Sequence, residues 1–181
     1  FVRDTFNIAQ PLIISQDIDF ELSNYSTYSI SCKDGNDGWI NATPTGGNVP
    51  YSFAWTGPNG YFSNSQNISG LSKGLYSLIV TNGLGCEEQF TFPISDPEEF
   101  LTGVVNSLYD YNGYDISCYD YNDGGIFFNP IGGVSPYTFF CDNVEILNPL
   151  VFKESGEFLI GIRDNNGCAW DGNIFLNQPD S

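Results

Sequence analysis

The sequence contains no histidine, and this absence excludes several classes of enzyme. Ser-His-Asp and Cys-His systems need an imidazole as general base, and the His-Glu-x-x-His zinc site needs it as a metal ligand. Basic residues are also scarce, since 5 Lys and Arg stand against 22 Asp and Glu and leave a net charge of −17. A chain with this charge repels the phosphates of nucleic acids and of anionic lipids. We therefore expect neither an enzyme nor a nucleic-acid-binding protein.

Long hydrophobic runs are absent too, and no stretch reaches the 18 apolar residues or so that a membrane-spanning helix needs. We therefore expect no membrane insertion. The 181 residues are 41% hydrophobic, which is enough for one large or two small packed cores. Aromatic residues make up 16% of the chain, and there are 20 glycines and 10 prolines. This balance is typical of short strands joined by tight turns.

An internal repeat organises the sequence. The motif Cys32-Lys-Asp-Gly-Asn-Asp-Gly38 recurs as Cys118-Tyr-Asp-Tyr-Asn-Asp-Gly124. Both copies continue with Gly-Gly and then with Pro-Tyr-x-Phe. Further along, Gly85-Cys86 recurs as Gly167-Cys168. The chain therefore contains two copies of one structural unit.

A closing motif, a hydrophobic run followed by proline, marks the end of each repeat at Pro11, Pro97 and Pro179. The first of these closes no complete repeat, so the chain is expected to be a segment of a longer protein. The predicted organisation is the last strand of a preceding repeat at residues 1–11, a first β-sandwich repeat at 12–97 and a second at 98–181.

Within the first repeat, short aromatic or alternating runs are separated by Gly, Pro, Asn and Asp about every 8 to 12 residues, which is typical of a β-sandwich. Tyr76, Leu78 and Val80 recur at period two and should share one buried face. No segment shows a sustained helical period. The predicted fold class is all-β, with two tandem immunoglobulin-like β-sandwich repeats. The expected strands of the first repeat are near 18–22, 27–32, 38–43, 51–56, 60–63, 75–82 and 88–94.

Four of the five cysteines occupy matched repeat positions. The economical interpretation is one disulfide inside each repeat, Cys32 with Cys86 and Cys118 with Cys168. Each bond would close a loop of about 50 residues and stabilise the fold by roughly 4 kcal/mol on the chain-entropy model. The alternative is four buried free thiols.

The fifth cysteine, Cys141, stands where the first repeat has Trp55. This position lies at the end of the Pro-Tyr-x-Phe strand and should face the core. We expect Cys141 to be a small buried hydrophobic residue with a free thiol. Without a histidine partner the thiol has no evident activator, so a nucleophilic role is not expected.

Two acidic turns place oxygen donors at every one or two residues, an arrangement that suits Ca²⁺. Their spacing is not that of an EF-hand, and Asn-Asp-Gly is also a common hairpin turn whose side chains bond their own backbone. Calcium binding and a purely structural turn therefore both stay open. The candidate calcium ligands are Asp34, Asn36, Asp37, Asp120, Asn122 and Asp123.

Two further patterns suggest contacts with sugars. Asn24, Asn41 and Asn67 each begin an N-glycosylation sequon, which matters only if the source organism has the modifying machinery. The second repeat also holds a run of tyrosines that could stack on sugar rings or form cross-strand pairs that stabilise a sheet. These tyrosines are Tyr109, Tyr111, Tyr114, Tyr119 and Tyr121.

The ordered motifs Cys-x-Asp-x-Asn-Asp-Gly, Gly-Gly, Pro-Tyr-Ser/Thr-Phe-x-Trp, Gly-Cys and a closing Gln-Pro resemble the SprB repeat of gliding-motility surface adhesins. The resemblance covers about residues 26–97 and 112–181. It implies tandem immunoglobulin-like modules in very long secreted proteins of Bacteroidota, exported by the type IX system and moved along the cell surface. The family carries no catalytic residues. Two positions depart from its pattern, Cys141 in place of Trp and Asn82 in place of Asp.

The expected function is that of an extracellular segment of a large cell-surface adhesin or filament, acting as a spacer and a multivalent contact surface in gliding motility. The alternative is a structural component of another extracellular or virion surface, such as a fibre or capsid decoration. Expected partners are neighbouring repeats of the same chain, with surface polysaccharide or self-assembly as further contacts. No cofactor other than calcium is suggested.

Overall fold

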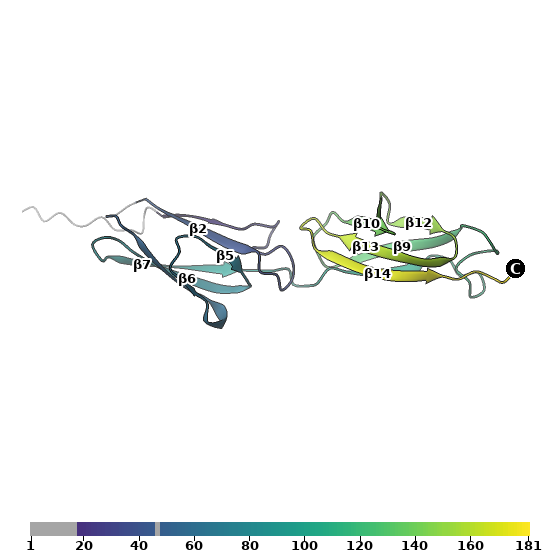
Figure 1. Cartoon of the computed structure of the whole chain (residues 1–181), viewed down its shortest axis with the longest axis horizontal. Helices are drawn as coiled ribbons and strands as arrows, with labels where there is room; N and C mark the ends of the chain where they lie inside the picture. The colour runs from purple at the N-terminus through teal and green to yellow at the C-terminus, as the bar shows by residue number, and fades with distance from the viewer. Residues whose placement is uncertain (1–17, 46–47) are drawn as a thin grey trace, which may run out of the picture. The chain divides into compact units, whose positions relative to one another are not determined.

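The structure is a computed structural model that describes residues 18–45 and 48–181 (Figure 1). The strand expected at residues 1–11 lies outside the described residues. The described part is all-β, as predicted: it contains antiparallel strands and one turn of 3-10 helix, η2 at Pro58–Gly60, and it has no α-helix. Within these residues no helix has the length and apolar character needed to cross a membrane.

The chain forms two compact units that are not contiguous in sequence. Unit 1 contains the described residues up to Asn24, together with Tyr28–Ile30 and Gly35–Ser95. Unit 2 contains Tyr25–Thr27, Ser31–Asp34 and Asp96–Ser181. Two short pieces of the first repeat thus belong to unit 2 by their contacts, which the division of the sequence into consecutive blocks did not anticipate.

Unit 1 contains two antiparallel sheets, with strand orders β1-β2-β5 and β4-β3-β6-β7. The longest pairing joins β6 to β7 from Gly74 opposite Ile94 to Thr81 opposite Glu87. The strands are β1 (Ile18–Leu22), β2 (Gly38–Pro44), β3 (Ser52–Thr56), β4 (Phe62–Ser63), β5 (Ile68–Leu71), β6 (Gly74–Thr81) and β7 (Glu87–Ile94).

The core of unit 1 lies between these sheets. Tyr76, Leu78 and Val80 are buried on one face of β6, as their period predicts. Trp55 on β3 is also fully buried, and its indole N–H donates to the carbonyl oxygen of Ser65 at 2.9 Å. A buried indole needs such an acceptor, because an unpaired N–H away from water destabilises the fold.

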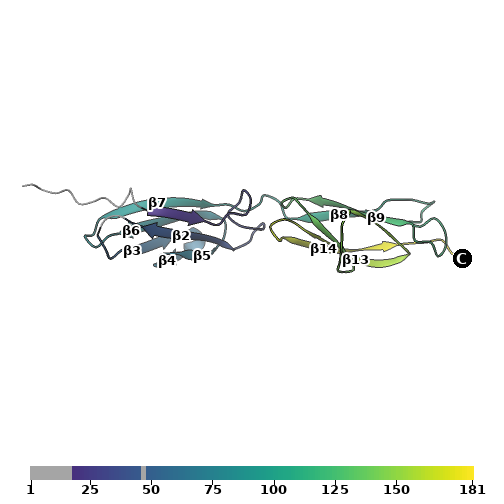
Figure 2. The ribbon, with the colours of Figure 1, turned by 90° about the horizontal axis from the view of Figure 1, so that it is seen from above.

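Unit 2 also contains two antiparallel sheets, β12-β9-β8 and β11-β10-β13-β14. Figure 2 shows the two layers from above, with β8 and β9 in one and β13 and β14 in the other. The strands are β8 (Thr102–Ser107), β9 (Gly124–Ile131), β10 (Thr138–Cys141), β11 (Val144–Ile146), β12 (Leu150–Lys153), β13 (Gly156–Arg163) and β14 (Ala169–Leu176).

The second core follows the repeat, with large changes of residue size at two matched positions: Cys141 stands in place of Trp55, and Phe128 stands in place of Ala42. Phe158, Ile160 and Ile162 are buried on one face of β13, in the positions that match the buried face of β6. Cys141 occupies the place of Trp55, is buried and carries a free thiol, as predicted. Burial raises the pKa of the Cys141 thiol above its ordinary value, which keeps it protonated and unreactive at neutral pH.

Candidate functional site

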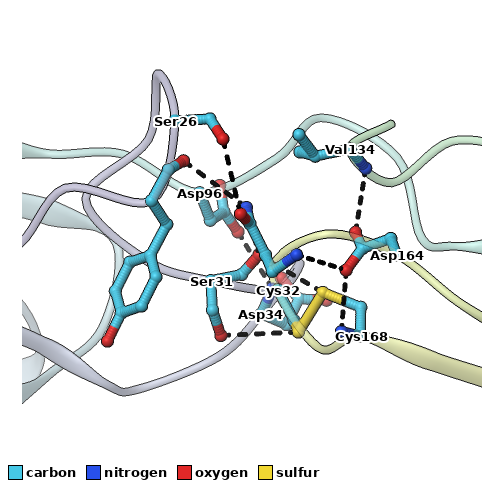
Figure 3. The surroundings of a disulfide bond; sticks show 10 residues. Ser26, Ser31, Cys32, Asp34, Asp96, Val134, Asp164 and Cys168 are labelled. Carbon is cyan, nitrogen blue, oxygen red and sulfur yellow. Dashed lines mark hydrogen bonds between the residues drawn. A yellow bond between two sulfur atoms is a disulfide. The ribbon is translucent and has the colours of Figure 1, made fainter. Parts of the chain in front are cut away.

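Among the described residues, Cys32 and Cys168 form a disulfide, with the two Cα atoms 5.6 Å apart (Figure 3). Cys86 and Cys118 are free. The predicted pairing inside each repeat, Cys32 with Cys86 and Cys118 with Cys168, is therefore wrong. The reason lies in the fold: Cys32 sits in Ser31–Asp34, which belongs to unit 2, whereas Cys86 belongs to unit 1.

Asn166 holds the short segments around Cys32 in unit 2. Its side-chain amide donates to the carbonyl oxygens of Tyr25 at 3.4 Å and of Ser31 at 3.3 Å. The hydroxyl of Ser26 donates to the Asn166 carbonyl oxygen at 3.5 Å. These contacts place the backbone before Cys32 beside the turn that carries Cys168.

The turn that presents Cys168 is organised by the carboxylate of Asp164, a buried side chain that is 7% exposed. One carboxylate oxygen accepts the backbone N–H groups of Asn166 at 2.9 Å and Cys168 at 2.8 Å. The other accepts the backbone N–H of Val134 at 2.8 Å. Three N–H donors thus compensate the burial of a charge that would otherwise be costly.

The first repeat builds the same turn around Cys86 with Asn82 in place of the aspartate. The side-chain oxygen of Asn82 accepts the backbone N–H groups of Leu84 and Cys86, each at 3.0 Å. The Asn82 N–H donates to the carbonyl oxygen of Cys86 at 3.0 Å, as the Asp164 N–H does to that of Cys168. The two turns therefore present their cysteines in the same way.

The acidic turns are also equivalent in the two repeats. Asp34 and Asp120 both have a left-handed backbone, with φ of 56° and 63°. The N–H of Asp34 donates to the carboxylate of Asp96 at 3.0 Å. The N–H of Asp120 donates to the side-chain oxygen of Gln178 at 3.1 Å. The residue before each closing proline thus anchors the acidic turn.

Among the candidate calcium ligands, Asp123 has a clear structural role. Its carboxylate accepts the Ser117 hydroxyl at 2.6 Å and the Ser117 backbone N–H at 3.1 Å. The hydroxyl contributes most to holding the pKa of Asp123 below its ordinary value. Asn36, Asp37 and Asn122 are exposed.

A group of three or more His, Cys, Asp or Glu side chains that could share a metal ion does not occur in the described part of the chain. Such a group would supply several of the six to eight oxygen ligands that calcium takes. The calcium site stays a prediction, and the hydrogen bonds of Asp123 show a turn function for that residue.

The three sequons lie at different depths. Asn24 and Asn67 are exposed, whereas Asn41 is half-buried within β2. The side-chain oxygen of Asn67 accepts the backbone N–H of Ala42 at 3.1 Å, so this amide binds the central strand β2 just beyond the end of its pairing with β5. Glycosylation at these positions stays a prediction.

An aromatic patch formed by Tyr109, Tyr111 and Phe152 lies on the surface of unit 2. The Tyr109 ring stacks on Phe152 with centroids 6.4 Å apart and contacts Tyr111 at 5.7 Å. Phe152 is 52% exposed and Tyr109 39%. Beside the patch is an open hollow lined by Tyr109, Asp110, Gly113, Tyr114, Asp115 and Asn177. The remaining predicted stacking residues, Tyr119 and Tyr121, are exposed but make no ring contact with the patch among the described residues.

The fold and the duplicated cysteine turns define a tandem β-sandwich protein. Within it, residues 24–60 match the model of the SprB repeat family. The matched span includes Cys32, the first acidic turn and Trp55, so the predicted resemblance is confirmed over these residues. The matched span lies within the first repeat. No curated protein matches the chain.

Proposed function

We propose that this chain is an extracellular segment of a large surface adhesin or filament. Each sandwich acts as a spacer and presents a weak contact surface, and binding strength comes from the number of copies. The observation that carries the proposal is that a chain with an SprB repeat at 24–60 folds as two sandwiches with matching cysteine turns. The resemblance to gliding adhesins extends the proposed role to gliding motility.

The disulfide and the charge support a place outside the cell. A bond such as that between Cys32 and Cys168 persists in oxidising compartments, whereas cytosolic thiols stay reduced. The net charge of −17 keeps such segments soluble and separate along an array. It also disfavours adhesion to anionic surfaces, so the contacts of this segment should rely on uncharged groups.

The aromatic patch is the proposed contact surface, and neutral polysaccharide is the partner that suits it. Sugar rings present C–H faces that stack on exposed aromatic rings, and the adjoining hollow places the carboxylate of Asp110 beside these rings. One patch of this size gives weak binding. Repetition along an array would make the total attachment strong.

Surface labelling tests the location. Antibodies raised against the purified chain should label intact cells of the producing organism as strongly as permeabilised cells. Labelling that requires permeabilisation would contradict the proposal. Label found on isolated fibres or virions rather than on the cell envelope would support the alternative, a structural component of another surface.

Adhesion of beads coated with the chain tests the contact surface. Replacing Tyr109 and Phe152 by alanine should reduce attachment to neutral polysaccharide at least tenfold, because multivalency amplifies a small loss at each site. Phe62→Ala is the matched control, since Phe62 is 73% exposed and belongs to unit 1. Equal attachment by all three proteins would remove the patch from the proposal.

A further inference from the structure

We propose that Cys118 and Cys86 each form a disulfide with another repeat of the same kind, so that successive repeats of an array are joined by a regular series of bonds. In this series the early cysteine of one repeat, the position of Cys32 and Cys118, bonds to the late cysteine of the next, the position of Cys86 and Cys168. The inference rests on the proposed role as a segment of a repeat array.

The bond already present sets the rule. Cys32 is the early cysteine of the first repeat, and it is joined to Cys168, the late cysteine of the second. The alternative partner of Cys118 within its own repeat is Cys168, which is already bonded. The same holds for Cys86, whose partner within its own repeat is Cys32. Both free thiols therefore need partners from other repeats if they are to be oxidised in the same pattern.

Cys86 has the surroundings of a bonded late cysteine. Its turn contains the same hydrogen bonds as the turn of Cys168. The Cys86 N–H donates to the side-chain oxygen of Asn82, and the Gly85 N–H donates to the Asn82 carbonyl oxygen at 2.9 Å. The matching bond from Gly167 N–H to Asp164 O measures 3.1 Å. The turn thus holds the backbone of Cys86 as the matching turn holds that of Cys168.

Cys118 has the surroundings of a bonded early cysteine. Asp120 and Asp34 each lie two residues after an early cysteine. The N–H of Asp120 donates to the side chain of Gln178, and the N–H of Asp34 donates to the side chain of Asp96. This anchoring fixes the backbone that follows each early cysteine relative to the end of its own repeat.

The backbone before each early cysteine is fixed in the same way. The Ser29 N–H donates to Ser95 O at 2.9 Å, and the Asp115 N–H donates to Asn177 O at 3.1 Å. In both repeats the residue that follows is an isoleucine with no exposed surface. Cys118 therefore lies two residues after the fully buried Ile116 and is itself exposed at the surface.

Exposure differs between the bonded and the free members of each pair. Cys168 is 8% exposed, and the bonded Cys32 packs against the core of unit 2. Cys118 has the same backbone anchoring as Cys32 but is exposed. A head-to-tail contact of this kind uses different surfaces on the two partners and so extends into an open array.

Formation of each bond is an oxidation that needs an acceptor of electrons. The thiolate of Cys118 attacks a disulfide oxidant, such as oxidised glutathione or a disulfide oxidoreductase, and releases one thiol of the oxidant. The thiolate of the partner's late cysteine then attacks this mixed disulfide and releases the second thiol. Two protein thiols become one disulfide, and one disulfide of the oxidant becomes two thiols.

The test is a tandem of two copies in which Pro179 of the first is followed by Leu12 of the second, as Pro11 precedes Leu12 in the chain itself. In one variant, the first copy carries Cys86→Ser and the second carries Cys118→Ser. The remaining Cys118 and Cys86 are then in the proposed order. The matched control carries Cys118→Ser in the first copy and Cys86→Ser in the second, which leaves the same two thiols in the reverse order.

Both proteins are oxidised with glutathione and mapped by non-reducing peptide analysis. We expect a peptide joining Cys118 to Cys86 in the first variant, at least tenfold more abundant than in the control. The peptide joining Cys32 to Cys168 should be present in both and reports that the sandwiches are folded. Equal amounts of the Cys118–Cys86 peptide in both proteins, or its absence from the first, would overturn the proposal, as would loss of the Cys32–Cys168 bond.

These outcomes are separate from those of the proposed function. If the tandem does not form the Cys118–Cys86 bond but antibodies label the cell surface, the disulfide series is wrong and the adhesin role is unaffected. If the tandem forms the bond but antibodies label only permeabilised cells, the disulfide series holds and the adhesin role is wrong.

Discussion

At the scale of single residues, the side chains that matter most are those that hold turns. Asp164 accepts three backbone N–H groups and shapes the turn that carries Cys168. Asn82 accepts two N–H groups in the matching turn of the first repeat. Relative to Asn82, Asp164 makes one further hydrogen bond, because its second carboxylate oxygen accepts the N–H of Val134.

Replacing Asp164 by alanine should destabilise unit 2 by about 2 to 4 kcal/mol, because hydrogen bonds to a charged group contribute about 1.5 to 3 kcal/mol each and are not additive. Asp164→Asn is the matched control. It keeps the two bonds that Asn82 makes in unit 1 and should cost less than half as much. Urea unfolding of both variants measures the difference, and equal losses would mean that the charge and the bond to the Val134 N–H, rather than the two bonds shared with Asn82, stabilise the turn.

The contact between Asp123 and Ser117 should make unit 2 sensitive to acid. The folded state lowers the pKa of Asp123 below 3.8, chiefly through the hydrogen bond from the Ser117 hydroxyl. A carboxyl with a lowered pKa stabilises the fold above its unfolded pKa, and this contribution is lost as the pH falls through the folded pKa. Ser117→Ala should therefore lower the melting temperature at pH 6 and have a smaller effect at pH 3. An effect of equal size at both pH values would show that the charge of Asp123 is not involved.

Divalent cations distinguish the two interpretations of the acidic turns. If the acidic turns are purely structural, as the bond between the Asp123 carboxylate and Ser117 favours, calcium and magnesium at millimolar concentration and fixed ionic strength should shift the melting temperature equally. A shift specific to calcium that disappears in Asp120→Ala would instead establish a calcium site. Ser181→Ala serves as a control for the effect of substitution alone.

At the scale of elements, the period-two pattern was sufficient to predict strands with one buried face. Tyr76, Leu78 and Val80 lie on β6 as expected. The pattern failed at residues 27–32, which form the end of a turn, a single bridge at Tyr28 and a series of bends. The N–H groups of Ser29 and Ile30 both donate to the carbonyl oxygen of Ser95. A strand would pair each N–H with a different acceptor.

The short strand β5 was not predicted, for a local reason. Its four residues include Gly70, which has a positive φ of 71° and gives no periodic signal.

The cysteine pairing could not be predicted from the sequence because the repeat is compatible with two pairings. Matched positions show which cysteines are equivalent, but a bond within a repeat and a bond to the next repeat satisfy the same repeat pattern.

The two cores differ strongly in residue size at two matched positions, Trp55 against Cys141 and Ala42 against Phe128. Trp55 and Cys141 are both buried, and so are Ala42 and Phe128, so each core holds one large and one small residue at this pair of positions. Trp55→Cys, which gives the first repeat the residue of the second, should destabilise unit 1 by roughly 3 to 5 kcal/mol through the cavity it leaves. Cys141→Ala removes far less volume and should cost about 1 kcal/mol. Urea unfolding monitored by far-ultraviolet circular dichroism, a signal that does not depend on Trp55, measures both free energies of unfolding. Similar losses of stability in the two variants would contradict the argument.

At the scale of the whole molecule, the disulfide changes how the chain responds to force. Cys32 and Cys168 are 136 residues apart, so the bond encloses most of both repeats. A pulling force applied at the two ends passes through the bond and bypasses the enclosed chain. The strands between the two cysteines can then unfold only within a closed loop, whereas β1 and β14 lie outside the loop and can still be drawn out. This property suits a spacer in a surface filament.

Single-molecule stretching between handles at Phe1 and Ser181 should therefore reveal a hidden length. The oxidised protein should extend only by the residues outside the bond, whereas the reduced protein should gain roughly 450 to 490 Å, at about 3.3 to 3.6 Å for each of the 136 residues. Cys32→Ser should extend like the reduced protein even under oxidising conditions. Cys141→Ser, which alters a cysteine that is free, should behave like the oxidised wild type. Equal extension of oxidised and reduced protein would show that the force does not pass through this bond.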